Sequence, residues 1–143
     1  GCGEKTFGRE TATTKGFVME FIHAPKACAS VGPYSHCVKA GSTYYLCGQV
    51  PFHPVTGEVV GNGMKEQAVQ TLANMKAVLE AAGLAVTDIA KTTVFVTNMD
   101  DFAAFNEVYA AFMGEHRPAR VCVEISNIAH GCLLEMDAIC FKE

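Results

Sequence analysis

Two stretches near the C-terminal end constrain the fold of this chain most strongly, because their side chains change character at every second position. Residues 118–125 have Val121, Val123 and Ile125 on one side and Arg120, Cys122 and Glu124 on the other. Residues 132–141 alternate in the same way, with Glu135 and Asp137 between apolar neighbours. A period of two is typical of a strand whose two faces differ. The sequence therefore predicts two strands that bring charged side chains into a β-rich region.

The loop between these two strands, residues 127–131, is short enough to close them into a hairpin. Such a hairpin would bring Arg120 and Glu135 into one neighbourhood. The register stays open, because a slip of one residue turns every side chain to the other face. A loop centred on its first two residues gives the two side chains a common face, and one centred on its middle residue does not.

The remaining elements follow from periodicity and turn residues. Strand-like sequences occupy residues 17–22, 36–40, 43–48 and 89–97. Apolar residues recur at helical spacing over residues 65–82 and from a cap at Asn98 or Asp100 to Met113. The expected order is β-β-β-α-β-α-β-β, an α+β domain whose sheet is covered by two helices on one face.

The first 16 residues hold several glycines and many small polar residues without an apolar period. We expect residues 1–16 to form a flexible N-terminal extension outside the fold. Residues 17–143 then make a single domain.

Two helices leave the opposite face of the sheet uncovered. In the last strand this face carries Ile139 and Phe141, alternating with Glu135 and Asp137. A face that mixes bulky apolar groups with a few charges is typical of a subunit interface with an embedded polar pocket, so we expect an oligomer. An amphipathic face in a monomer is the alternative.

Composition argues against several classes of partner. A net charge of −4 and a pI near 5.7 provide no basic surface for nucleic acid or acidic membranes. Seven cysteines without a CxxC pair indicate reduced thiols, so we expect a cytoplasmic protein; Lys, Arg and Thr among the first residues leave a mitochondrial location open. Five scattered histidines offer no metal site, and no glycine-rich phosphate motif is present, so we expect neither metal nor cofactor.

Seven short motifs recur in this order in one known family: APKA (24–27), GPYS (32–35), CGQVP (47–51), PVTGEVV (54–60), KTTVFV (91–96), FNEVY (105–109) and PARVCVE (118–124). From residue 19 to residue 143 the chain resembles the reactive intermediate deaminase family, RidA/YjgF, and its arginine motif resembles that of the imine-deaminating subgroup. The resemblance implies a chorismate-mutase-like fold and a homotrimer around a β-barrel-like core, with clefts between subunits. It also implies hydrolysis of 2-imino acids or enamines, made by pyridoxal-phosphate enzymes from threonine or serine, to 2-keto acids and ammonia.

Arg120 is the candidate for binding the substrate. A planar guanidinium holds a carboxylate through two parallel charge-assisted hydrogen bonds. The alternative is a structural ion pair with Glu124 or Glu135.

Glu135 matches the acidic position of the family, where it would orient or deprotonate a water. A carboxyl group in an apolar interface is expected to have a raised pKa. Asp137 has a structural role in this interpretation.

Five further residues match substrate-binding positions of the family: Tyr34, Cys47, Gly48, Asn106 and Cys122. Gly48 would offer its backbone N–H to the substrate carboxylate. Most relatives have Ser where this chain has Cys47, a weaker hydrogen-bond donor, so the substrate range is open. Purely structural roles are the alternatives: Tyr34 as an interface aromatic, Gly48 as a bend and Asn106 as a surface residue. No base lies beside Cys122 in the sequence, which argues against a nucleophilic thiol.

Two rival functions remain. The older naming of the family suggests RNA cleavage or inhibition of translation, which the acidic charge balance disfavours. A ligand-binding or chaperone-like trimer without turnover would instead use the exposed apolar face.

Overall fold

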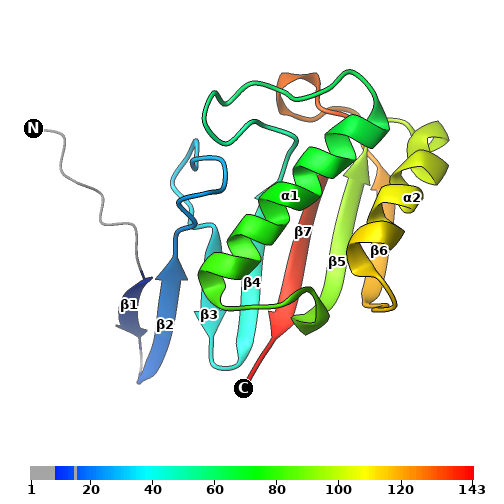
Figure 1. Ribbon diagram of the computed structural model, residues 1–143. Helices are drawn as coiled ribbons and strands as arrows, with labels where there is room; N and C mark the ends of the chain where they lie inside the picture. Colours follow the sequence, from blue (N-terminus) through cyan, green and yellow to red (C-terminus); the bar gives the residue numbers. More distant parts are fainter. Residues whose placement is uncertain (1–8, 15) are drawn as a thin grey trace, which may run out of the picture.

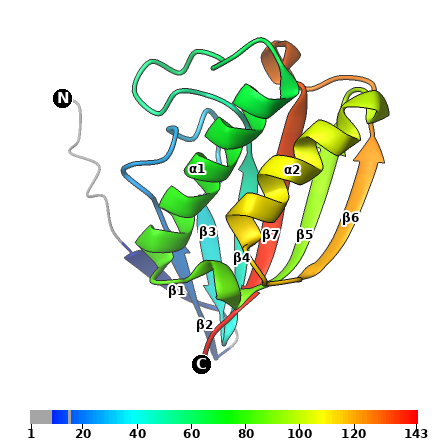
Figure 2. The ribbon, with the colours of Figure 1, turned by 45° about the vertical axis from the view of Figure 1, so that its right-hand side comes forward.

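The computed structural model describes residues 9–14 and 16–143. Its strands form one seven-stranded sheet in the order β1-β2-β3-β4-β7-β5-β6. The helices α1 and α2 both lie against the same face of this sheet (Figure 1, Figure 2). The elements are β1 (Arg9–Thr14), β2 (Phe17–Ile22), β3 (Cys37–Ala40), β4 (Thr43–Gln49), α1 (Met64–Ala82), β5 (Ile89–Val96), α2 (Phe102–Met113), β6 (Ala119–Glu124) and β7 (Leu134–Phe141), with short 3-10 turns at Val86–Asp88, Met99–Asp101 and Ala129–Gly131. The predicted α+β class is confirmed.

Local chemistry favours the end of the first helix and the turn that leads into the second. The α1 helix ends at Gly83, whose left-handed conformation (φ 75°) suits a residue without a side chain. Ahead of α2, the Asn98 side chain accepts a hydrogen bond from the backbone N–H of Asp100 at 2.9 Å. Buried residues of both helices, such as Met75 and Phe105, join the sheet in one core. The predicted helices are thus confirmed, with a 3-10 turn preceding the second.

The uncovered face of the sheet is apolar and exposed, as the alternation of β7 predicts. Leu134, Met136, Ala138 and Cys140 are buried against the helices, whereas Ile139 and Phe141 are exposed on the opposite face. Tyr45 on β4 is the register partner of Ile139 and is 50% exposed. No helix of the described chain covers this face, which we call the open face (Figure 2).

The predicted hairpin between the last two strands is wrong. β6 pairs in parallel with β5, and β7 pairs antiparallel with the other side of β5. The reason is that α2 returns the chain to the starting end of β5, so β6 runs in the same direction as β5, as in a βαβ unit. Residues 125–133 then cross over to β7 at the far side of β5. The register sets Arg120 opposite the buried Thr92 and Glu135 opposite Phe95, three residues further along β5. Arg120 therefore lies on the helix-covered face, whereas Glu135 lies on the open face.

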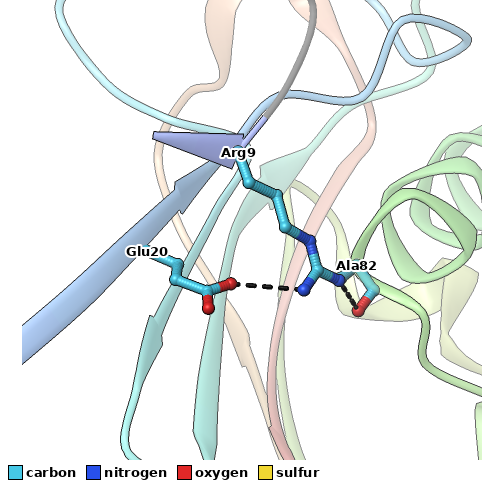
Figure 3. Close-up of polar contacts among 3 residues, drawn as sticks. All are labelled: Arg9, Glu20 and Ala82. Carbon is cyan, nitrogen blue, oxygen red and sulfur yellow. Dashed lines mark hydrogen bonds and ion pairs between the residues drawn. The ribbon is translucent and has the colours of Figure 1, made fainter. Parts of the chain in front are cut away.

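The N-terminal segment also differs from expectation. Arg9–Thr14 form β1, which pairs antiparallel with β2 and extends the sheet. Arg9 makes a 3.2 Å ion pair with Glu20 and donates a 2.7 Å hydrogen bond to the carbonyl of Ala82 (Figure 3). The last turn of α1 has no basic residue of its own, so Arg9 supplies the positive charge that a helix C-terminus favours. Backbone pairing needs no apolar period, which is why the sequence pattern missed this strand; residues 1–8 and 15 of the predicted extension lie outside the described residues.

Candidate active site

The first half of the site surrounds Arg120 on the helix-covered face. Its guanidinium carbon lies 4.8 Å from the ring centroid of Tyr109, 5.3 Å from that of Phe102 and 6.0 Å from that of Phe105. Arg120 Nη1 donates a 2.8 Å hydrogen bond to Asn106 Oδ1. All four partners come from one side of α2, because their spacing of three or four residues places them on one helical stripe. The sequence therefore builds a half-buried aromatic bed under the guanidinium.

Arg120 has no carboxylate partner in residues 9–14 and 16–143. The ion pairs there join Arg9 to Glu20 and Lys65 to Glu107. Glu124, one predicted partner, instead accepts a 2.8 Å hydrogen bond from the backbone N–H of Met99. A guanidinium carries five N–H donors, and the described contacts of Arg120 use one of them. The remaining donors can bind an anion.

The second half of the site is a cavity of about 110 Å³ near the end of β4. Its lining residues are Cys28, Ala29, Val31, Tyr34, His36, Cys47, Gly48, Gln49, Val50, Phe52, Ala129 and Glu135. Four of the predicted site residues, Tyr34, Cys47, Gly48 and Glu135, thus lie together. A Cβ atom at Gly48 would lie 3.0 Å from Glu135 Cδ and Oε2, so a larger residue here would have to displace the Glu135 carboxylate from its present position.

Burial shifts the pKa values of two side chains that line this cavity. It raises the pKa of Glu135, and the negative charge of Asp137 raises that pKa further. Burial also raises the pKa of the Cys47 thiol to about 11, although a hydrogen bond from Gln49 opposes the shift. Gln49 Nε2 donates that bond to Cys47 Sγ at 3.1 Å. Cys47 is therefore a neutral thiol at pH 7, whereas Glu135 is suited to exchange a proton.

Two buried residues that the sequence interpretation missed hold the cavity walls. His36 Nδ1 accepts a 2.8 Å hydrogen bond from the backbone N–H of Ala24, so its Nε2 carries the proton and donates to the Cys28 carbonyl at 2.8 Å. Asn74 on α1 donates hydrogen bonds to the carbonyls of Val50 and Phe52 at 2.9 and 2.8 Å. A polar residue on the apolar stripe side of α1 and a histidine beside the GPYS motif were the signals available for finding them.

The predicted site residues form two separate groups within one chain. Arg120, Asn106 and Cys122 lie at β6 and α2, and Tyr34, Cys47, Gly48 and Glu135 line the cavity. Burial raises the pKa of the Cys122 thiol, against the opposing charge of Arg120. Within the described residues no hydrogen bond joins that thiol to a base, so nothing there activates it as a nucleophile.

The described residues form neither a metal-binding cluster nor a membrane-spanning helix. In residues 9–14 and 16–143, no group of three or more His, Cys, Asp and Glu side chains is arranged to hold a metal ion. Neither of the two described helices has the length and hydropathy that crossing a bilayer requires.

Sequence comparison places this chain among known proteins. The family model described as Endoribonuclease L-PSP matches residues 23–142. A RutC family protein of Pyrococcus horikoshii is 47% identical over 126 residues, which are 88% of this chain and 100% of that protein. The 2-iminobutanoate/2-iminopropanoate deaminase of Escherichia coli K12 is 44% identical over 124 residues, which are 85% of this chain and 96% of that protein.

Solved structures agree with the sequence relatives. Escherichia coli TdcF with bound serine has a TM-score of 0.81 and 40% identity, covering 86% of this chain and 98% of its own. RidA from the Antarctic bacterium Psychrobacter has a TM-score of 0.79 and 42% identity, covering 82% and 95%. The motifs, the fold and these relatives lead to one conclusion: the chain belongs to the Endoribonuclease L-PSP family, which is the RidA/YjgF family.

Proposed function

We propose that this protein is a 2-iminobutanoate/2-iminopropanoate deaminase, which hydrolyses reactive 2-imino acids to 2-keto acids and ammonia. The observation that supports this most directly is the state of Arg120. Its guanidinium is held by α2 and has no carboxylate partner among the described residues. A fixed and unpaired guanidinium is suited to bind the carboxylate of a small planar acid. The similar Escherichia coli protein of that name supports the same substrate class.

The reaction assigns complementary roles to the two groups of residues. Arg120 and the backbone N–H of Gly48 bind the substrate carboxylate. Glu135 accepts a proton from a water molecule while the oxygen of that water attacks the carbon of the C=N bond. The proton that Glu135 has accepted is passed to the imine nitrogen, which gives a carbinolamine. Its hydroxyl proton then moves to the nitrogen as the C=O bond forms and the C–N bond breaks, so ammonia leaves and the 2-keto acid remains. The raised pKa of Glu135 favours this proton exchange near neutral pH. The substrate-binding site is completed by the side chains of Tyr34, Cys47, Asn106 and Cys122.

The site requires a second copy of the chain. Arg120 and Glu135 lie on opposite faces of one sheet, so a single chain cannot direct both at one small molecule. The open face is apolar and exposed, which suits an interface between copies. A homotrimer with one cleft between each pair of subunits satisfies both conditions.

The test is ammonia release from 2-iminobutanoate, generated in place by a threonine dehydratase. The full-length protein should accelerate release. Arg120→Ala removes two charge-assisted hydrogen bonds, so kcat/KM should fall by about 100- to 10,000-fold. Oligomer size, measured by light scattering, should not change.

Arg117→Ala is the matched control, because Arg117 lies three residues away and donates to the carbonyls of Gly114 and His116 on the surface. It should keep full activity. Equal rates with wild type and Arg120→Ala would contradict the catalytic assignment. Binding of 2-ketobutanoate without turnover by wild type would leave a ligand-binding protein as the better account.

A further inference from the structure

A set of contacts beneath Arg120 has no role in the reaction described above. Thr92 on β5 is the register partner of Arg120 on β6, and its side chain is fully buried. Its hydroxyl oxygen lies 2.8 Å from the hydroxyl oxygen of Tyr109 on α2. The Tyr109 ring is in turn the aromatic group closest to the guanidinium, at 4.8 Å. The contacts therefore run from a buried strand residue through a helix residue to Arg120.

This arrangement restricts a side chain that is otherwise flexible. The single hydrogen bond to Asn106 fixes one end of the guanidinium but allows its plane to turn about that bond. An aromatic face beneath the cation favours a stacked orientation and disfavours others. The Tyr109 ring can do this only while it is itself held. The hydroxyl of Thr92 holds it, and because Thr92 is fully buried, it cannot easily replace this bond with one to water.

We propose that Tyr109, anchored by Thr92, is a positioning residue that sets the plane of the Arg120 guanidinium for binding a planar carboxylate. The inference rests on the proposed function, in which Arg120 binds the carboxylate of a 2-imino acid. Tyr109 acts through Arg120 and does not touch the substrate. Phe102 and Phe105 widen the aromatic bed, but neither has a polar group to anchor its ring.

The sequence makes a direct test practical, because it contains three arginines: Arg9, Arg117 and Arg120. Their side-chain Nε–H groups give separate signals in an NMR spectrum of the full-length, 15N-labelled protein, and Arg120→Lys identifies the signal of Arg120. The stacked guanidinium should give a signal shifted upfield by the Tyr109 ring. Affinity for 2-ketobutanoate, a stable product of the reaction, is measured on the same samples.

Tyr109→Leu removes the ring, so the Arg120 signal should lose its upfield shift and the Kd for 2-ketobutanoate should rise about tenfold. In turnover, KM should rise more than kcat falls. Thr92→Val removes only the anchor and should raise the Kd by a smaller factor, about threefold. Thr92→Ser keeps the hydroxyl and should restore both the signal and the affinity, which a purely structural role for Thr92 does not require.

Tyr44→Leu is the matched control. Tyr44 also lies under a cation, with Lys39 Nζ 5.6 Å from its ring centroid, but it is buried and lies on β4. It should leave the Arg120 signal and the Kd unchanged. The proposal is overturned if folded Tyr109→Leu keeps both at wild-type values; if that variant does not fold, Thr92→Val and Thr92→Ser decide in the same way.

The outcome also separates this inference from the proposed function. A wild type that releases no ammonia, but whose Arg120 signal and 2-ketobutanoate affinity respond as expected, contradicts the deaminase assignment and supports the positioning role. A signal that responds in a protein that does not bind 2-ketobutanoate overturns the carboxylate part of the proposal.

Discussion

The two halves of the candidate site differ in how they hold a charge. Around Arg120, an aromatic bed and one amide fix a cation that has no carboxylate partner among the described residues. Around Glu135, a small cavity holds a carboxylate whose pKa is raised by burial and by Asp137, and no arginine or lysine is among the described residues that line it. Each half thus contains the charge that the other lacks. Because the two lie on opposite faces of one sheet, the proposed reaction needs a second chain to bring these opposite charges to one substrate.

The largest effect is expected from a substitution that breaks the proposed oligomer, on which this complementarity depends. Tyr45→Glu places a charge in the open face, where a closed interface would have to desolvate it. We expect loss of the oligomer in light scattering and loss of deaminase activity. Val69→Glu is the control, since Val69 is 58% exposed on α1, away from that face. An oligomer that survives Tyr45→Glu with normal activity would mean that the open face is not the interface.

Mixing two inactive variants sharpens the comparison further. Arg120→Ala lacks one half and Glu135→Gln lacks the other, so each alone should be inactive. After joint unfolding and refolding at equal amounts, a site between copies finds both intact halves in about one quarter of cases. Activity should return to about that fraction of wild type. No recovery, despite mixed oligomers seen by mass spectrometry, would place both halves within one chain.

A smaller effect is expected from changing the charge beside Glu135. Asp137 raises the pKa of Glu135, so Asp137→Asn should lower it. The proposed reaction requires the ionised form of Glu135, so the acid limb of the profile of kcat/KM against pH should move to lower pH. Glu115→Gln, at an exposed position outside the cavity, should leave the profile unchanged. A shift to higher pH would contradict the assigned role of Glu135.

The smallest effect is expected at an arginine on the helix-covered face that belongs to neither half. Arg9 contacts Glu20 and the end of α1, and both interactions are partly exposed. Arg9→Ala should lower the free energy of unfolding by less than about 1 kcal/mol in urea titrations, and activity should not change. A loss of activity would show that the β1 edge communicates with the site.

Much of the fold was predictable because periodicity reports burial directly. The stripes of both helices and the alternation of β7 were read correctly from residue spacing. The pairing of the last strands was not predictable in this way, since a short loop is compatible with a hairpin and with a crossover. β1 escaped notice because its contacts are mainly backbone hydrogen bonds, which leave no apolar pattern in the sequence.

The candidate site was likewise predictable from the sequence only in part. The motif resemblance identified Arg120 and Glu135, and the pocket residues Tyr34, Cys47 and Gly48 do lie beside Glu135. The roles of Thr92 and Tyr109 were hidden, because Tyr109 sits in an apolar stripe that is expected of any buried helix.

The sequence by itself determined which residue types this protein has for its chemistry, and which faces of its helices and strands are buried, because both follow from local composition and spacing. The tertiary structure alone decided which charges meet. β6 and β7 both pair with β5, in a register that sets Arg120 opposite Thr92 and Glu135 opposite Phe95, so the two charged residues face opposite sides of the sheet. Strand order depends on packing over the whole domain, and no local pattern in the sequence records it.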